Sequence, residues 1–184
     1  MKIAHLLGAA VVLLTLAPIN ACKQIGNSQS PDVSDAVRKS LDQQGLKDVT
    51  VSQDRDKGIV TLGGTVASEQ QKTQAESITN SLAGGQVVAD QIAVVPPGTG
   101  KEVSAVNSDL DDGISKNLDA ALIQNKLHKD VSYAVKNGVV TLSGEVGSDA
   151  ERTGAESIAD AVPNVHQVVN VIQVTGKRKA SSGQ

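Results

Sequence analysis

The sequence predicts an α+β protein built from two tandem αββαβ units, each a three-stranded mixed sheet covered on one face by two helices. Three observations support this fold class: an internal repeat, a strand–turn–strand pattern in each copy, and a capped amphipathic helix in each copy. The chain has 184 residues, of which 39% are hydrophobic. A chain of this length can form two small domains.

The repeat is carried by two segments that match at an offset of 80 positions. Residues 58–66 read G-I-V-T-L-G-G-T-V and residues 138–146 read G-V-V-T-L-S-G-E-V, and the register continues without a gap to the end of each copy. We therefore expect one domain at residues 31–95 and a second at residues 109–175. Between them, residues 96–108 begin with Pro-Pro-Gly, which predicts a semi-flexible linker.

Each copy opens with an amphipathic helix that leads into a pair of strands. Apolar residues recur at helical spacing at Val33, Val37 and Leu41 and again at Ile114, Leu118 and Leu122. In the second copy, apolar residues alternate on both sides of Asn137-Gly138, a pair typical of a two-residue type I′ turn. The first copy has a loop at residues 54–58 that is two residues longer.

A second helix and a final strand complete each copy. Ser68 is followed three residues later by Gln71, and Ser148 by Glu151, so both helices begin with a predicted capping box. The final strands are expected at residues 88–94 and 168–174, where apolar residues recur.

Two glycines interrupt the apolar pattern of the second strand in each copy. Gly64 and Gly144 fall on the face that is expected to point inward. A residue without a Cβ would let a helix approach the sheet closely at that point. We interpret both as structural packing glycines and not as parts of a phosphate-binding loop.

The N-terminus predicts export. Residues 1–21 combine Lys2 with a short apolar run that ends near Pro18, the pattern of a signal peptide and too short for a membrane-spanning helix. Cys22, the one cysteine of the chain, follows Ile-Asn-Ala and resembles the lipidated cysteine of bacterial lipoproteins. A lipid anchor on Cys22 and a polar tether over residues 22–30 are expected; cleavage without lipidation would leave a soluble periplasmic protein.

The V-T-L-x-G-x-V strand, the Ser-capped helix carrying A-E-S-I and the final V-x-x-x-I-x-V strand resemble the BON domain of bacterial envelope proteins. With the signal and Cys22, the chain is similar to double-BON outer-membrane lipoproteins and to osmotically inducible periplasmic BON proteins. The resemblance implies no catalysis and no cofactor. It implies support of outer-membrane integrity or osmotic stress tolerance through phospholipid, peptidoglycan or an envelope protein, at the periplasmic side of the outer membrane.

Charge restricts the partners. The formal net charge is −3, so a strong positive field for nucleic acid is absent, and both repeats are net acidic. Local basic groups are still candidate contacts for anionic lipid or a partner, because each lysine near an anionic surface contributes about 1 kcal/mol. They are Lys116, Lys126 and Lys129 around the first helix of the second copy, and Lys177, Arg178 and Lys179 in a predicted disordered tail over residues 176–184. Ordinary solvated lysines remain the alternative interpretation.

The sequence contains only incomplete matches to the motifs of nucleotide-binding, metal-binding or catalytic sites. Residues 95–102 resemble a nucleotide-binding P-loop, but Val95 replaces the first glycine, Glu102 replaces the hydroxyl that would bind Mg²⁺, and a strand-to-helix setting is not expected there. His128 and His166 lack metal-ligand spacing, and the acidic run at residues 109–112 is interpreted as the flank of a helix N-terminus. We therefore expect no enzyme activity, no nucleotide and no metal.

Overall fold

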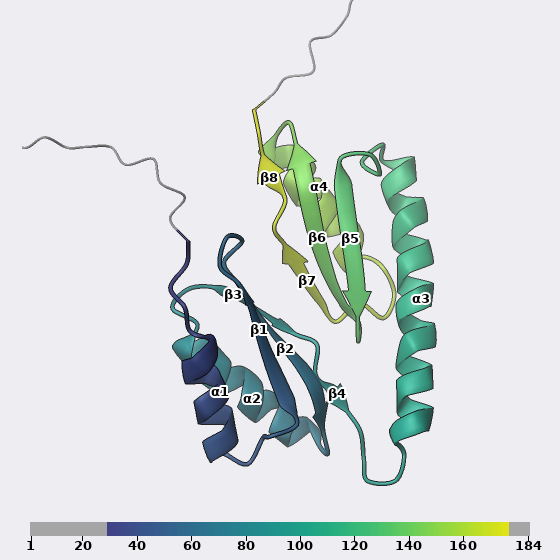
Figure 1. Ribbon diagram of the computed structural model, residues 1–184. Coiled ribbons are helices and arrows are strands. Elements are labelled where there is room, and N and C mark those ends of the chain that lie inside the picture. Colours follow the sequence, from purple (N-terminus) through teal and green to yellow (C-terminus); the bar gives the residue numbers. More distant parts are fainter. Residues whose placement is uncertain (1–28, 177–184) are drawn as a thin grey trace, which may run out of the picture.

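The computed structural model describes residues 29–176, and these form two αββαβ units in the predicted order (Figure 1). The first unit consists of α1 (Ser34–Gln43), β1 (Val49–Asp54), β2 (Ile59–Val66), α2 (Glu69–Leu82), β3 (Val87–Asp90) and β4 (Ala93–Val94). The second consists of α3 (Gly100–Gln124), β5 (Val131–Lys136), β6 (Val139–Val146), α4 (Asp149–Asp160), β7 (Gln167–Asn170) and β8 (Gln173–Val174). The predicted α+β class and the duplication are confirmed.

The sheet topology is the same in both units. The central strand β2 pairs with β1 in the antiparallel sense and with β3, then β4, in the parallel sense. Strand β6 has the same relation to β5, β7 and β8. The final strand of each unit is therefore split into two short pieces that follow one central strand. The register agrees across the repeat, since Val60 faces Val88 and Val140 faces Val168.

The local signals of the sequence form the expected structures. Asn137 and Gly138 both adopt positive φ, at 48° and 74°, as a two-residue hairpin turn requires. The Ser68 hydroxyl accepts from the backbone N–H of Gln71, whose side chain accepts from the N–H of Ala67 at 2.8 Å. Ser148 and Glu151 make the same arrangement at the start of α4.

Each unit has its own hydrophobic core between its sheet and its helices. The first core joins Val37 and Leu41 of α1 to Val60 and Leu62 of β2. The second joins Leu118 and Leu122 of α3 to Val140 and Leu142 of β6. Ala75 in α2 and Ala155 in α4 are fully buried in these cores, so small alanine side chains allow each second helix to lie close to its sheet.

Gly64 and Gly144 have a different role from the one predicted. They have φ values of +88° and +122°, and a Cβ at either position would overlap with a backbone carbonyl oxygen, that of Asp48 or Asp130. The N–H of the following residue donates to the same carbonyl in each copy. The glycines thus permit a bend against the neighbouring chain segment, as in a β-bulge, and they do not make room for a helix.

The predicted linker is largely helical. Helix α3 begins at Gly100 and continues without a break to Gln124, so residues 100–108 extend the first helix of the second unit and do not form a flexible connection. Residues 101–108 contain neither proline nor glycine, which makes them compatible with a helix. In Figure 1, helix α3 begins near β4 of the first unit, and its later turns run alongside β5 of the second unit.

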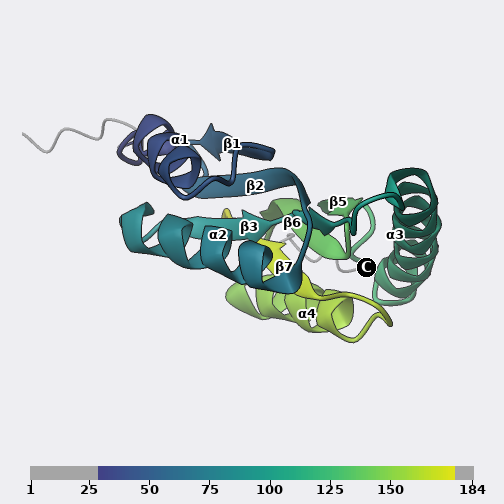
Figure 2. The same ribbon diagram turned by 90° about the horizontal axis from the view of Figure 1, so that it is seen from below.

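The two units pack through the sheet faces that carry no helices. Strand residues alternate between faces, so Ile59 and Ala89 point away from the core of the first unit. They join Val139 and Val169, their repeat equivalents, in a separate buried cluster. Strands β3 and β7 lie next to each other, with helices on the outer sides (Figure 2). The two sheets therefore contact each other in an approximately symmetric way.

Candidate functional site

Polar side chains reinforce the contact between the two units. The Gln167 side chain in β7 donates to the carbonyl oxygen of Val88 at 2.7 Å and accepts from the backbone N–H of Asp90 at 3.0 Å. One amide thus satisfies two backbone groups of β3. The repeat equivalent of Gln167 is the apolar Val87, and this departure from the repeat is the one sequence signal that could have indicated the contact.

The turn between β5 and β6 forms a second connection. The Asn137 side chain donates to the carbonyl oxygen of Gln91 in the first unit at 2.6 Å. The carboxylate of Asp111, in α3, accepts from the backbone N–H groups of Asn137 and Gly138 at 2.8 and 2.9 Å. Asp111 was predicted to flank the start of a helix. It lies instead within α3, because the helix begins earlier, and it attaches α3 to the hairpin.

These contacts border a cleft of about 290 Å³ between the units. Its walls come from the end of β2, the break between β3 and β4, the first half of α3 and the β5–β6 hairpin. The lining residues include Gly63, Thr65, Gln91, Ser104, Ser108 and Lys136. The sequence did not predict this cleft, since it depends on the helical extension at residues 100–108 and on how the units pack.

The lysines predicted as contacts are only partly brought together. Lys126 and Lys129 are exposed in the turn that follows α3, whereas Lys116 lies eight residues before the end of that helix, about 12 Å along its axis. Lys126 has φ 60° and ends the helix in the conformation that Gly45 adopts in the first unit. Cys22, Lys177, Arg178 and Lys179 lie outside the described residues.

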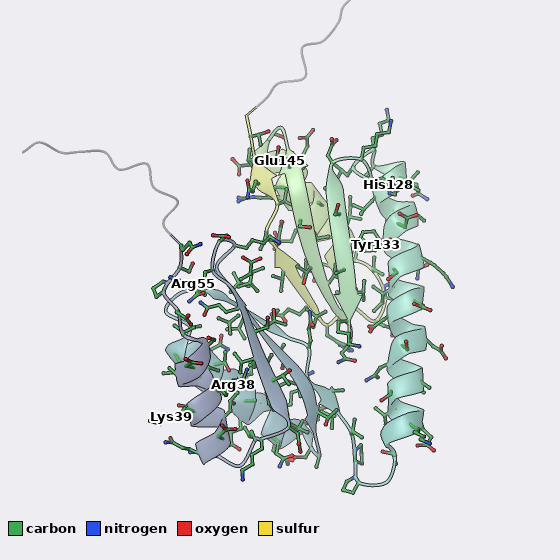
Figure 3. All side chains as sticks on the ribbon, in the orientation of Figure 1. Arg38, Lys39, Arg55, His128, Tyr133 and Glu145 are labelled. Atoms are coloured by element: carbon green, nitrogen blue, oxygen red, sulfur yellow. The ribbon has the colours of Figure 1, made fainter. Side chains whose placement is uncertain are left out.

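Ionisable groups near this end of α3 pair with one another. His128 Nδ1 lies 2.9 Å from the Asp119 carboxylate, and the Tyr133 hydroxyl donates to the carbonyl oxygen of Ser115 at 3.1 Å. Burial, and then the nearby Asp119 charge, raise the pKa of Tyr133 above its ordinary value. Figure 3 shows Tyr133 on β5 facing α3, with His128 just beyond the helix end. The Tyr133 hydrogen bond attaches α3 to the sheet, and the His128 contact holds the turn after α3 against the helix.

The carboxyl group of Asp90 is the buried acid of the first unit. Its side chain accepts from the backbone N–H of Ile92 at 3.0 Å, and Lys72 Nζ lies 4.0 Å away. Burial raises the pKa of Asp90, against the opposing effects of the Ile92 hydrogen bond and the Lys72 charge. The Asp90 carboxyl group spans the break between β3 and β4 through its hydrogen bond to Ile92. We therefore interpret Asp90 as a structural residue.

The segment that resembles a P-loop follows a strand and precedes a helix, contrary to expectation, since β4 ends at Val94 and α3 begins at Gly100. The intervening loop nevertheless lacks the N–H groups of Pro96 and Pro97 that a phosphate cradle would need. Among residues 29–176, no three acidic, histidine or cysteine side chains are grouped as a metal site would require. No helix in that range is both long and apolar enough to cross a membrane.

Comparisons with known proteins agree with the duplication. The BON domain family matches residues 30–96 and again residues 110–176. Osmotically-inducible protein Y of Escherichia coli (strain K12) is 30% identical over 155 residues, which cover 82% of this chain and 76% of that protein.

Two solved structures of CdsD, a structural protein of the type III secretion system of Chlamydia trachomatis, are also similar, one of them of its C-terminal domain. Each is 17% identical and covers 76% of this chain, with TM-scores of 0.30 and 0.31. The chain spans 66% and 62% of those two solved chains.

Proposed function

Since this chain belongs to the BON-domain family, we propose that it is a non-catalytic envelope lipoprotein that supports outer-membrane integrity or osmotic stress tolerance. The observation that carries the proposal is the pair of BON domains behind a predicted signal peptide and Cys22. The similarity to a protein named as osmotically inducible supports the link to osmotic stress. A soluble periplasmic, stress-induced or chaperone-like protein is the alternative.

We place the binding activity at the end of α3 in the second unit. Lys126 and Lys129 are exposed on one turn, and neither takes part in an ion pair among residues 29–176. This turn can approach an anionic headgroup without disturbing the contact between the units. Each lysine contributes about 1 kcal/mol near an anionic surface, so a weak, salt-sensitive attachment is expected. Peptidoglycan or an envelope protein remains the other class of partner.

Mass spectrometry of the mature protein tests the anchor. An acylated Cys22 at the N-terminus is the expected result, because several acyl chains would hold the protein firmly at a membrane. An unmodified N-terminus near Ala21 or Cys22 would favour the soluble alternative.

Vesicle flotation of the unacylated mature chain tests the lipid contact. The double variant Lys126→Asn with Lys129→Gln removes both charges, and asparagine tolerates the positive φ at position 126. We expect binding to anionic vesicles to fall about 30-fold. The matched control, Lys39→Gln with Lys47→Gln, removes two exposed charges from the first unit. Binding that is independent of salt, or equal loss in both double variants, would exclude this lipid site.

A further inference from the structure

The cleft between the units is lined by uncharged residues apart from one lysine. It is lined by hydroxyl groups, amides and glycine backbone, and Lys136 is its one ionised side chain among the described residues. The chain as a whole is acidic, with 20 acidic against 17 basic residues, yet no carboxylate lines this cleft. The local electrostatics therefore favour an anion in a protein whose average field repels one.

Several polar side chains in the cleft have no partner within the described chain. The side chains of Thr65, Gln91 and Ser108 make no hydrogen bond there. The Lys136 ammonium likewise has no carboxylate within ion-pair distance in residues 29–176. At the equivalent hairpin position the first unit carries Asp54, which pairs with Lys57. The unpaired lysine is thus particular to the second unit.

The walls of the cleft are held in place before any ligand arrives. The hairpin that carries Lys136 is attached to α3 through Asp111 and to the first unit through the Asn137–Gln91 hydrogen bond. Such a site loses little conformational entropy on binding.

The size and lining restrict the ligand class. A volume of 290 Å³ corresponds to about ten water molecules of liquid, enough for a monosaccharide-sized molecule. Ala93 is the one aliphatic side chain among the residues that form the walls, so the cleft offers an acyl chain no continuous aliphatic surface. Hydroxyl and amide groups with one ammonium suit a hydroxylated ring that carries a single carboxylate.

We propose that this cleft binds a small sugar acid, with its carboxylate on Lys136 and its hydroxyls on Thr65, Gln91 and Ser108. The site goes beyond the lipid contact of Lys126 and Lys129, since different residues form it. Such a group has two sources, a free hexuronic acid or the N-acetylmuramic acid of peptidoglycan strands from which the stem peptide has been removed, since the peptide otherwise occupies that carboxyl group in an amide bond.

Nuclear magnetic resonance titration of the unacylated mature chain tests the proposal, with glucuronate and N-acetylmuramate as probes and glucose and N-acetylglucosamine as neutral controls. We expect shifts of the backbone amide resonances of Gly63, Gly64 and Ser108 with at least one acid, at a dissociation constant of about 1 mM. Shifts with N-acetylmuramate alone would support the site and identify peptidoglycan as the source of its ligand.

Lys136→Gln should weaken the acid about tenfold, the effect of losing one charge-assisted contact. Lys39→Gln, which removes an exposed charge of the first unit outside the cleft, should leave the affinity unchanged. Ser108→Phe, which fills the cleft from an exposed helix position, should abolish the shifts. No shift with either acid, equal binding of the neutral sugars, or equal affinities of the two lysine variants would overturn the proposal. Lys136→Gln should bind anionic vesicles as well as the parent chain does. Loss of the sugar-acid site can therefore be distinguished from loss of the lipid contact.

Discussion

Asp90 and Asn170 occupy equivalent positions, and their difference shows what a single buried charge does in this fold. Each side chain accepts from the backbone N–H two residues later, at the break in its final strand. The Asn170 amide also donates to the carbonyl oxygen of Arg152 and to the Glu156 carboxylate. Asp90 cannot donate when it is ionised, and burial raises its pKa.

Replacing Asp90 by asparagine should therefore stabilise the protein at neutral pH. An acid with a raised folded-state pKa contributes stability that is fully present below its unfolded pKa and is lost as pH rises through the folded pKa. We expect Asp90→Asn to raise the free energy of unfolding by on the order of 1 kcal/mol at neutral pH. The gain should shrink as the pH falls towards about 4, the ordinary aspartate value.

Urea unfolding at neutral pH and at about pH 4 measures the change in the free energy of unfolding. Asp42→Asn, at an exposed position of α1, is the control. A loss of stability in Asp90→Asn at neutral pH would mean that attraction to Lys72 outweighs the cost of burial.

Tyr133 offers a direct optical test, because the chain has one tyrosine and no tryptophan. Burial and the Asp119 charge raise its pKa, so phenolate absorbance should appear at a higher pH in the folded chain than in urea. Asp119→Asn should reduce the difference, since it removes the nearby charge. Identical titration curves for the folded and unfolded chains would contradict the contact with α3.

At the scale of elements, the glycine of the second strand determines where each sheet bends. Gly144→Ala should destabilise the second unit by about 2 kcal/mol or more, because alanine must adopt φ +122° and its Cβ overlaps with the Asp130 carbonyl. Gly154 lies in helix α4 with open space around it, so Gly154→Ala should instead stabilise by about 0.5–1 kcal/mol. Thermal unfolding of both variants measures the contrast. A mild effect of Gly144→Ala would show that the strand can straighten.

Element boundaries show where sequence patterns were sufficient. Local signals, such as the turn at Asn137-Gly138 and the capping boxes, were predicted correctly because neighbouring residues alone determine them. The start of α3 was not, because Pro96-Pro97 and the polar residues after them also suit a linker. Asp111 lies before the predicted start of the helix but inside α3. Its carboxylate attaches this part of α3 to the β5–β6 hairpin, 26 residues later in the chain.

For the whole molecule, the contact between the two helix-free faces decides whether the units behave as one body. Gln167→Val introduces the residue of the first copy and leaves two groups of β3, the Val88 carbonyl and the Asp90 N–H, without their partner. We expect a loss of about 2 kcal/mol in the coupling between the units, with little change in either core.

Unfolding followed by probes in each unit measures this coupling, with coincident transitions in the parent chain and separated transitions in Gln167→Val. Val87→Ala, a change at the exposed equivalent position, is the control. Coincident transitions in Gln167→Val would show that the apolar cluster of Ile59, Ala89, Val139 and Val169 is sufficient.

The sequence by itself determined the repeated αββαβ order and its turns and caps, because these depend on residues close together in the chain or on a pattern that occurs twice. Only the tertiary structure decided the role of Gly64 and Gly144, the length of α3, the pairing of the two units and the cleft beside Lys136. Each of these depends on which backbone atoms come together across long sequence separations, and no local pattern carries that information.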